Sequence, residues 1–192
     1  MKITIPSNNG LQEIELETSP GIFSPGGADK GTLAMLAEVK LEAGQTLLDL
    51  GCGSGIVAVW AAKQLGEDNV SMLDKDLKAI LAANKNAQKN GFGNIKAFVS
   101  DGFSNYTIMD LDWILSNPPY HSDFSVAKSF IEKGFNRLKI GGRMVMVTKR
   151  ETWYKNKFIA IFGGVRIVKS NDYFIFTAEK RSSLYANRKE VK

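Results

Sequence analysis

Three glycines at alternate positions, Gly51, Gly53 and Gly55, directly follow an apolar run at residues 46–48. The run has the character of a buried strand, and residues 54–65 are expected to form a helix. Glycine adopts backbone conformations that other residues avoid, and it lets the backbone approach a ligand closely. The chain is therefore predicted to turn sharply from a strand into a helix here, where a ligand can lie against the backbone.

Short apolar strands alternate with helical segments along most of the chain. Strands are expected at residues 45–50, 69–73, 95–99, 112–116, 143–148, 165–168 and 173–178, and helices at 54–65, 76–90, 123–138 and 152–162. This alternation predicts an α/β fold, a doubly wound and mostly parallel sheet of seven strands. The last two strands have only Lys169 to Asp172 between them, so they should form a hairpin in which the last strand is antiparallel.

The amino-terminal segment has a different pattern. Polarity alternates in residues 2–5 and 11–16, on either side of Asn9-Gly10. That dipeptide favours a tight turn, so the segment 1–22 is expected to contain a short β-hairpin. A glycine-rich connection then leads to a helix over residues 33–40.

Glycine pairs follow two of the predicted helices. Helix 123–138 should end at Gly141-Gly142, and helix 152–162 at Gly163-Gly164. The buried face of the first helix is predicted to consist of Phe124, Ala127, Ile131, Phe135 and Leu138. No second domain is expected, so residues 1–192 are interpreted as one domain that ends in a basic tail, 181–192.

Composition excludes several classes of protein. No apolar run approaches the roughly 20 residues of a membrane span, and residues 1–20 lack the layout of a signal peptide. The single cysteine, Cys52, suits a reducing cytoplasm because it has no internal disulfide partner. One cysteine and one histidine, His121, are too few for structural zinc. We expect a cytoplasmic protein with no membrane partner and no metal.

Charge is distributed unevenly along the chain. Residues 139–192 hold 13 Lys and Arg against 4 Asp and Glu, whereas residues 1–138 hold 12 against 16. Such asymmetry indicates either a basic surface that binds a phosphate backbone or a solvated face with a frayed tail. Lys149, Arg150, Lys155 and Lys157 follow the strand that ends near residue 148, at the edge of the sheet where ligands bind, and are candidates for holding phosphates.

The glycine loop fits two kinds of cofactor. Residues 53–58 match the dinucleotide pattern, and Asp74 lies 21 residues beyond Gly53, near the expected spacing of about 20. Asp49 favours S-adenosylmethionine instead, because a carboxylate there can receive the cofactor's ammonium group but would repel a pyrophosphate.

Acidic residues at the ends of successive strands complete the predicted cofactor site. Asp74 should accept the two ribose hydroxyls, and Asp101-Gly102 should receive the adenine amino group. Asp76 is expected to cap the following helix. Cys52 is interpreted as a small residue that fills the turn, not as a nucleophile.

The segment Asn117-Pro118-Pro119-Tyr120 directly follows another predicted strand. The prolines restrict the backbone, so the Asn117 amide oxygen and the Pro118 carbonyl can be held as two acceptors for one amino group. Tyr120 can stack on a base or another planar group. The segment therefore predicts a pocket for a planar amine beside the cofactor, which favours methyl transfer to nitrogen.

These residues resemble those of class I S-adenosylmethionine-dependent methyltransferases. Gly21-Ile22-Phe23-Ser24 followed by Asp29-Lys30-Gly31-Thr32-Leu33 is similar to the entry segment of the small methyltransferase domain (MTS) of RsmC-type ribosomal RNA guanine-N2 methyltransferases. The resemblance covers about residues 10–180 and implies a Rossmann-like fold, with Phe23 and Ser24 close to the cofactor. RsmC-type enzymes also carry a duplicated amino-terminal half, and some have Phe where this chain has Tyr120.

The expected function is transfer of a methyl group from S-adenosylmethionine to an exocyclic amine of RNA. By the resemblance, the target is guanine N2 of small-subunit (16S-type) ribosomal RNA, either free or in the ribosomal subunit. Glutamine-N5 methylation of a protein, adenine-N6 methylation of nucleic acid and a non-catalytic scaffold that binds RNA and senses the cofactor are the alternatives.

Overall fold

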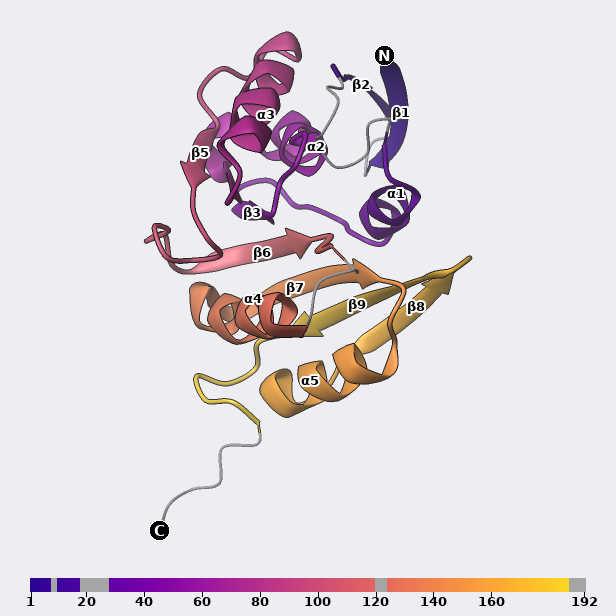
Figure 1. Cartoon of the computed structure of the whole chain (residues 1–192), viewed down its shortest axis with the longest axis vertical. Coiled ribbons are helices and arrows are strands. Elements are labelled where there is room, and N and C mark those ends of the chain that lie inside the picture. Colours follow the sequence, from indigo (N-terminus) through magenta and orange to yellow (C-terminus); the bar gives the residue numbers. More distant parts are fainter. Residues whose placement is uncertain (8–9, 18–27, 120–123, 187–192) are drawn as a thin grey trace.

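The computed structural model describes residues 1–7, 10–17, 28–119 and 124–186. Seven strands form one sheet in the order β5-β4-β3-β6-β7-β9-β8 (Figure 1). These strands are β3 (Leu47–Leu50), β4 (Val70–Asp74), β5 (Lys96–Val99), β6 (Leu111–Ser116), β7 (Leu138–Thr148), β8 (Arg166–Ser170) and β9 (Tyr173–Glu179). Neighbouring strands from β5 to β7 pair in parallel, whereas β9 is antiparallel to both β7 and β8. The predicted Rossmann-like sheet and its antiparallel last strand are confirmed.

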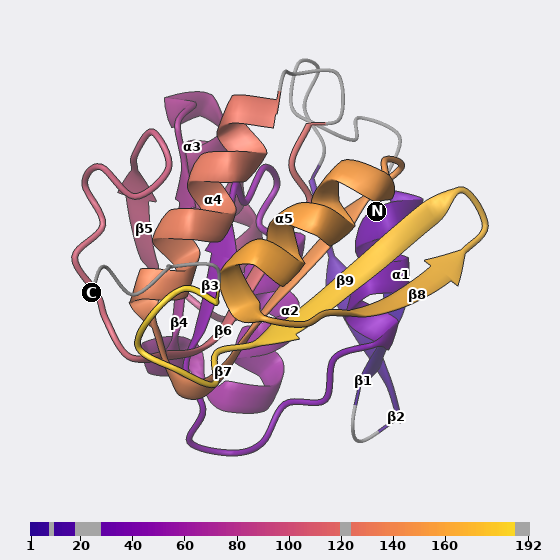
Figure 2. The same ribbon diagram turned by 90° about the horizontal axis from the view of Figure 1, so that it is seen from below.

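Helices cover both faces of this sheet (Figures 1 and 2). They are α1 (Lys30–Ala37), α2 (Ile56–Leu65), α3 (Leu77–Lys89), α4 (Phe124–Arg137) and α5 (Thr152–Phe162), with a short 3-10 turn at Glu67–Asn69. Residues from α1, α2 and α3 pack into one core cluster, and residues from α4 and α5 pack into a second. The central strands contribute alternate residues to the two clusters, so they are buried on both faces.

The predicted hairpin is present. β1 (Lys2–Ser7) pairs antiparallel with β2 (Gly10–Glu15), while Asn9 of the expected turn lies outside the described residues. Ile5 and Ile14 are fully buried in the same core cluster as α2. The Trp60 indole N–H on α2 also donates to the Pro6 carbonyl oxygen at 2.8 Å. The hairpin thus packs on the same side of the sheet as α1, α2 and α3.

Predicted boundaries differ from the observed ones by two residues or fewer, except at α1 and at the start of β7. The prediction that Gly141-Gly142 ends α4 is wrong. The helix ends at Arg137, and Leu138 begins β7. Gly141 has a φ of +84° and its N–H donates to the Lys180 carbonyl oxygen at 2.8 Å. The glycines therefore lie within β7, where its pairing with β6 shifts register.

Two further features concern the carboxyl-terminal part. The Tyr185 hydroxyl donates to the Glu132 carbonyl oxygen at 3.0 Å, and the Ala186 N–H donates to the Ile161 carbonyl oxygen at 3.1 Å. The first half of the predicted tail therefore packs on α4 and α5. Residues 187–192 lie outside the described part. Among the helices that the structure describes, none is long and apolar enough to cross a membrane.

Candidate functional site

The glycine loop connects the carboxyl end of β3 to the start of α2. Gly51, Gly53 and Gly55 have φ angles of +75°, +52° and +76°, which other residues rarely adopt. The N–H groups of Gly51 and Cys52 both donate to the Leu73 carbonyl oxygen on β4 at 2.9 Å. A Cβ at Gly55 would lie 2.8 Å from an alanine side chain on α3, so this glycine also allows the two helices to pack closely. The predicted strand-to-helix turn is confirmed.

Residues that follow four neighbouring strands line one cavity of about 210 Å³. Its lining includes Gly51, Gly53, Asp74, Asp101, Gly102, Asn117, Pro118 and Pro119. A smaller cavity of about 40 Å³ shares Gly51, Gly53 and Asn117 with it and also contains Asp49. The structure thus brings the glycine loop and the Asn-Pro-Pro segment to one common space. Phe23, Ser24 and Tyr120 lie outside the described residues.

Asp49 is the last-but-one residue of β3 and is only 2 % exposed. Its carboxylate accepts a hydrogen bond from the Ala58 N–H in the first turn of α2 at 3.1 Å. Burial raises the pKa of Asp49 to about 7, and the nearby Asp74 adds to this effect, while the hydrogen bond from Ala58 opposes it. A buried carboxyl group in this state is stabilised in its ionised form by any cation placed beside it.

Asp74 lies at the end of β4 and connects the glycine loop to the start of α3. One carboxylate oxygen accepts from the Gly53 N–H and the other from the Asp76 N–H, both at 3.0 Å. Each carboxylate oxygen retains a further lone pair, so both remain able to accept from a ligand hydroxyl. Asp76 itself caps α3 by accepting from the Lys78 N–H at 2.9 Å, as predicted. The exposed Asp101 lies after β5 and beside Gly102 in the same cavity.

Cys52 has the environment of a packed, unreactive side chain. It is 5 % exposed, and burial together with Asp49 and Asp74 raises the pKa of its thiol. A thiol in this environment stays protonated at neutral pH and is a poor nucleophile.

Asn117 has the most informative hydrogen bonds of the site. Its amide nitrogen donates to the Asp29 carboxylate at 2.8 Å and to the Thr32 hydroxyl at 2.9 Å. Its amide oxygen is buried and has no hydrogen-bond partner among the described residues. Buried acceptors are almost always paired in folded proteins. This oxygen is therefore available to a ligand in the cavity.

Two kinds of site residue are not among those predicted from the sequence. Asp29 and Thr32 stand there only as part of a motif, because nothing local indicates that they contact a residue 85 or more positions away. Phe130 is 8 % exposed and lines the larger cavity. Phe130 lies three residues after Ala127, so the helical periodicity contained a signal for it.

The four candidate phosphate-binding residues have different environments. Lys149 and Arg150 are exposed directly after β7, with Lys149 5.1 Å from the centroid of the Tyr173 ring and the Arg150 guanidinium 5.0 Å from that of Phe124. Lys155 is exposed on α5.

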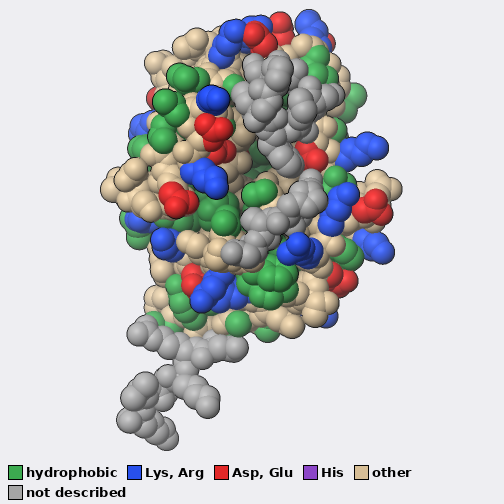
Figure 3. Space-filling view, in the orientation of Figure 1, with side chains coloured by type: hydrophobic (Ala, Val, Ile, Leu, Met, Phe, Trp, Pro, Cys, Tyr) green, Lys and Arg blue, Asp and Glu red, His purple; other side chains and the backbone are tan. Residues whose placement is uncertain are grey.

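Lys157 forms an ion pair with Glu132 that joins α5 to α4, which makes it the least suited of the four to bind a phosphate. On the face seen in Figure 3, basic side chains are interspersed with acidic ones.

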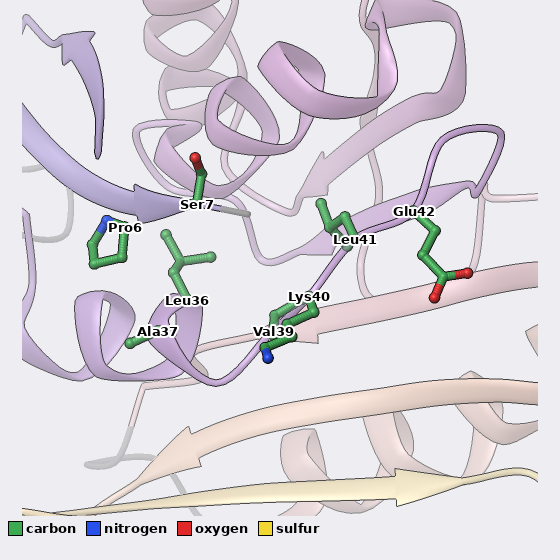
Figure 4. A pocket seen from close by; sticks show the side chains of 8 residues that line it. All are labelled: Pro6, Ser7, Leu36, Ala37, Val39, Lys40, Leu41 and Glu42. Carbon is green, nitrogen blue, oxygen red and sulfur yellow. The ribbon is translucent and has the colours of Figure 1, made fainter. Parts of the chain in front are cut away.

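A separate hollow of about 390 Å³ lies away from these residues, between the end of β1 and the segment that follows α1 (Figure 4). Its lining includes Pro6, Leu36, Leu41 and the charged Lys40 and Glu42. It shares no residue with the two cavities at the strand ends. Within the described residues, no cluster of three or more His, Cys, Asp or Glu side chains is arranged to hold a metal ion.

Residues 13–177 match the family model of the methyltransferase small domain. The chain belongs to this family. All the candidate site residues lie in the matched range, including the three that the structure does not describe. The family assignment therefore covers the glycine loop, the Asn-Pro-Pro segment and the basic residues that follow β7.

The chain is similar in sequence to several bacterial proteins. The chain is 32% identical over 180 residues to ribosomal RNA small subunit methyltransferase C of Psychromonas ingrahamii, covering 89% of this chain and 50% of that protein. It is 29% identical to the uncharacterized protein YbxB of Bacillus subtilis, covering 88% and 87% of the two chains. The chain thus spans about half the length of the ribosomal RNA methyltransferases that it matches, but most of YbxB.

Solved structures agree with this assignment. The 16S rRNA N2 methyltransferase RsmC of T. thermophilus, in complex with AdoMet and guanosine, superposes with a TM-score of 0.78 at 26% identity, covering 94% of this chain and 50% of that one. A methyltransferase from Pyrococcus furiosus superposes with a TM-score of 0.73 at 18% identity, covering 88% and 90%. The second likeness concerns the fold alone.

Proposed function

We propose that this protein is an S-adenosylmethionine-dependent methyltransferase that modifies an exocyclic amine of RNA, namely guanine N2 of 16S-type ribosomal RNA. The observation that carries the proposal is the buried, unpartnered amide oxygen of Asn117 in the cavity that the glycine loop also lines. A hydrogen-bond acceptor that is already oriented beside the proposed cofactor site suits an amino group as the group that receives the methyl. A ribosomal target would place the reaction in the cytoplasm.

The cavity residues fit S-adenosylmethionine. When bound, this cofactor supplies a methyl group carried on a positively charged sulfur. The backbone at Gly51 leaves room for it, since within the part of the chain that the structure describes a Cβ there would meet only Phe130, at 3.8 Å. Asp49 would receive its ammonium group, Asp74 would accept its ribose hydroxyls, and Asp101 with Gly102 would receive its adenine amino group. Phe23 and Ser24 complete this cofactor site.

Asn117 and Pro118 orient the substrate amine. Its two N–H groups would donate to the Asn117 amide oxygen and the Pro118 carbonyl oxygen, which would leave the nitrogen lone pair for the methyl group. As the new N–C bond forms and the S–C bond breaks, the amine would release one N–H proton to water. Pro119 stiffens the segment, and Tyr120 stacks on the base. The site needs no strong general base, because the methyl donor is already a potent electrophile and correct placement within about 3–3.5 Å governs the rate.

The proposed phosphate-binding group consists of Lys149, Arg150, Lys155 and Lys157. Residues 1–192 would act as one methyltransferase domain. Support for an RNA substrate comes from the ribosomal RNA methyltransferases that the chain resembles over about half of their length. The RsmC structure that superposes on this chain is a complex with AdoMet and guanosine, which supports guanine as the target base.

The test is to incubate the purified protein with tritiated S-adenosylmethionine and, separately, 16S rRNA, assembled small subunits, 23S rRNA and ribosomal protein. The labelled RNA is then digested to nucleosides, and the methylated nucleoside is identified. We expect N2-methylguanosine from 16S rRNA or from the small subunit. Label in adenosine would contradict the proposed guanine target and indicate an adenine-N6 methyltransferase. Label only in protein glutamine would indicate a glutamine-N5 methyltransferase. Tight cofactor binding with no label in any substrate would favour a non-catalytic role.

A companion variant tests the proposed role of Asn117. Asn117→Ala should lower kcat by about tenfold or more and leave the Kd for S-adenosylmethionine nearly unchanged, because the lost contact is made to the reacting amine. Steady-state kinetics measures kcat, and calorimetry measures the Kd for S-adenosylmethionine. An unchanged kcat removes Asn117 from the mechanism.

A further inference from the structure

We propose that Asp29 and Thr32 are positioning residues that determine which end of the Asn117 amide faces the substrate. This inference rests on the proposed function, because it assigns the two residues a task in presenting the amide oxygen to the amine. Neither residue lines the larger cavity together with the strand-end acids. Both line the smaller cavity, and so does Asn117.

The orientation of the Asn117 amide follows from the chemistry of its partners. A side-chain amide has a donor end and an acceptor end of nearly the same size, so packing alone discriminates poorly between two orientations related by a flip. An ionised carboxylate only accepts hydrogen bonds. Asp29 lies 2.8 Å from the Asn117 nitrogen and Thr32 lies 2.9 Å from the same atom. A flipped amide would place its oxygen against the Asp29 carboxylate oxygen, which is repulsive.

The fixed nitrogen leaves the amide oxygen as the end that a substrate meets. This oxygen is buried and accepts no hydrogen bond from the described residues. Leaving a buried acceptor without a partner is unfavourable, so a free amide would turn to relieve it. Two hydrogen bonds on the nitrogen oppose that rotation and keep the acceptor oriented before the amine arrives. The amine then forms its hydrogen bonds without first reorganising Asn117.

The two positioning residues are themselves fixed at the start of α1. The same Asp29 oxygen that contacts Asn117 caps the helix by accepting from the Thr32 N–H at 3.1 Å. Tyr173 of β9 packs over the first turn so closely that a Cβ at Gly31 would lie 2.7 Å from its ring. Helix α1 is therefore packed against β9 beside Asn117. Loss of the packing between α1 and β9 would release the Asn117 amide.

The experiment compares variants that remove an acceptor with variants that keep it. Asp29→Ser retains a good helix cap but is too short to reach Asn117, and Thr32→Val removes the hydroxyl at nearly constant shape. Asp29→Asn and Thr32→Ser are the matched controls, because each keeps an oxygen that can accept. We expect kcat to fall by about threefold to fivefold in each single loss variant and by about tenfold in the double variant. The controls should retain most of the wild-type kcat.

A second readout does not depend on activity. The two side-chain N–H signals of Asn117 are assigned by NMR as those missing from Asn117→Ala. We expect them to exchange slowly with water in the wild type and at least about fivefold faster in Thr32→Val and in the double variant. Thermal unfolding of every variant identifies any that fail to fold. If the double variant does not fold, Thr32→Val against Thr32→Ser decides the question by both readouts.

The outcomes separate this inference from the proposed function. A large loss in Asn117→Ala with wild-type kcat and wild-type amide exchange in the loss variants would overturn the positioning role and leave the proposed function standing. Wild-type activity in Asn117→Ala would instead contradict the proposed mechanism and, with it, this inference. Equal losses in the loss variants and their controls would show a merely structural role for the two residues.

Discussion

Replacement of Asp49 by asparagine should make the ligand-free protein more stable at neutral pH and should weaken cofactor binding. Burial raises the pKa of Asp49 from 3.8 to about 7 in the folded protein. That difference corresponds to about 4 kcal/mol as an upper value, since local relaxation and water entry reduce the cost of the buried charge. Asparagine keeps a carbonyl oxygen for the Ala58 N–H and carries no charge.

The sign of the pH dependence follows from linkage. The folded state of the wild type binds more protons than the unfolded state between about pH 4 and pH 7, because its Asp49 pKa is the higher one. The contribution of Asp49 to stability therefore falls as the pH rises through this window and is constant above it. The asparagine variant lacks this dependence, so its advantage over the wild type should grow from pH 5 to pH 8.

The assay is urea unfolding at pH 5, 6, 7 and 8 without ligand. Asp112→Asn is the control of opposite sign: burial opposes ionisation of Asp112, but hydrogen bonds with Lys139 and Thr46 outweigh it and hold the pKa below its usual value. Its contribution is present above the usual pKa of 3.8 and is lost as the pH falls below it. Asp112→Asn should therefore show no change in its effect between pH 5 and pH 8, and in an added measurement at pH 3 it should destabilise less than at pH 7. A difference between wild type and Asp49→Asn that does not change between pH 5 and pH 8 would refute the reasoning.

Cofactor binding supplies the second half of this prediction. If Asp49 receives the ammonium group, binding favours its ionised form, and the affinity should rise by up to about tenfold per pH unit as the pH increases from 5 to 7. Calorimetry in two buffers of different ionisation enthalpy should detect the release of a proton at pH 6. Asp49→Asn should show lower affinity and no proton release, and equal release in both proteins would exclude Asp49 as the group concerned.

Two further predictions concern packing and RNA. Gly55→Ala should lower the free energy of unfolding by about 3 kcal/mol, because its Cβ would lie 2.8 Å from a side chain on α3 and its φ is +76°. Gly44 has a similar φ but open space around it, so Gly44→Ala should cost only about 1 kcal/mol. Equal losses of the two variants in urea unfolding would contradict the argument from close approach. Changing Lys149 and Arg150 together to alanine should raise the KM for RNA and reduce its salt dependence by about two phosphate contacts, whereas the exposed Lys96→Ala on β5 should leave both unchanged. An identical salt slope in the double variant would remove these residues from the RNA surface.

Much of the candidate site follows from local sequence. The strand before Gly51 and the helix after Gly55 share one short segment, and the positive φ angles of the loop are ones that glycine tolerates. The same holds for the Asp76 cap, whose partner lies two residues away. Local hydrogen bonds and steric limits depend on neighbours in the chain, so a single sequence reveals them.

Misread elements show the limit of local patterns. Gly141-Gly142 satisfies the expectation for a helix end, yet these glycines lie in β7 beside Lys180. A Cβ at Gly142 would lie 2.6 Å from the Leu111 carbonyl oxygen, so the pairing of β6 and β7 determines the need for glycine there. Local sequence also gives no sign that Lys157 forms an ion pair with Glu132, because that pair depends on the packing of α5 on α4.

The sequence by itself determined the α/β fold, the glycine turn and the presence of an amide after β6, because each depends on residue type and spacing within a short stretch. Only the tertiary structure decided the state of the groups in the cavity. Docking of α1 on the sheet brings Asp29 to Asn117 across 88 positions and orients the amide. Burial against the first turn of α2 raises the pKa of Asp49. Both effects depend on which distant atoms surround a group and exclude water from it, and sequence spacing does not contain that information.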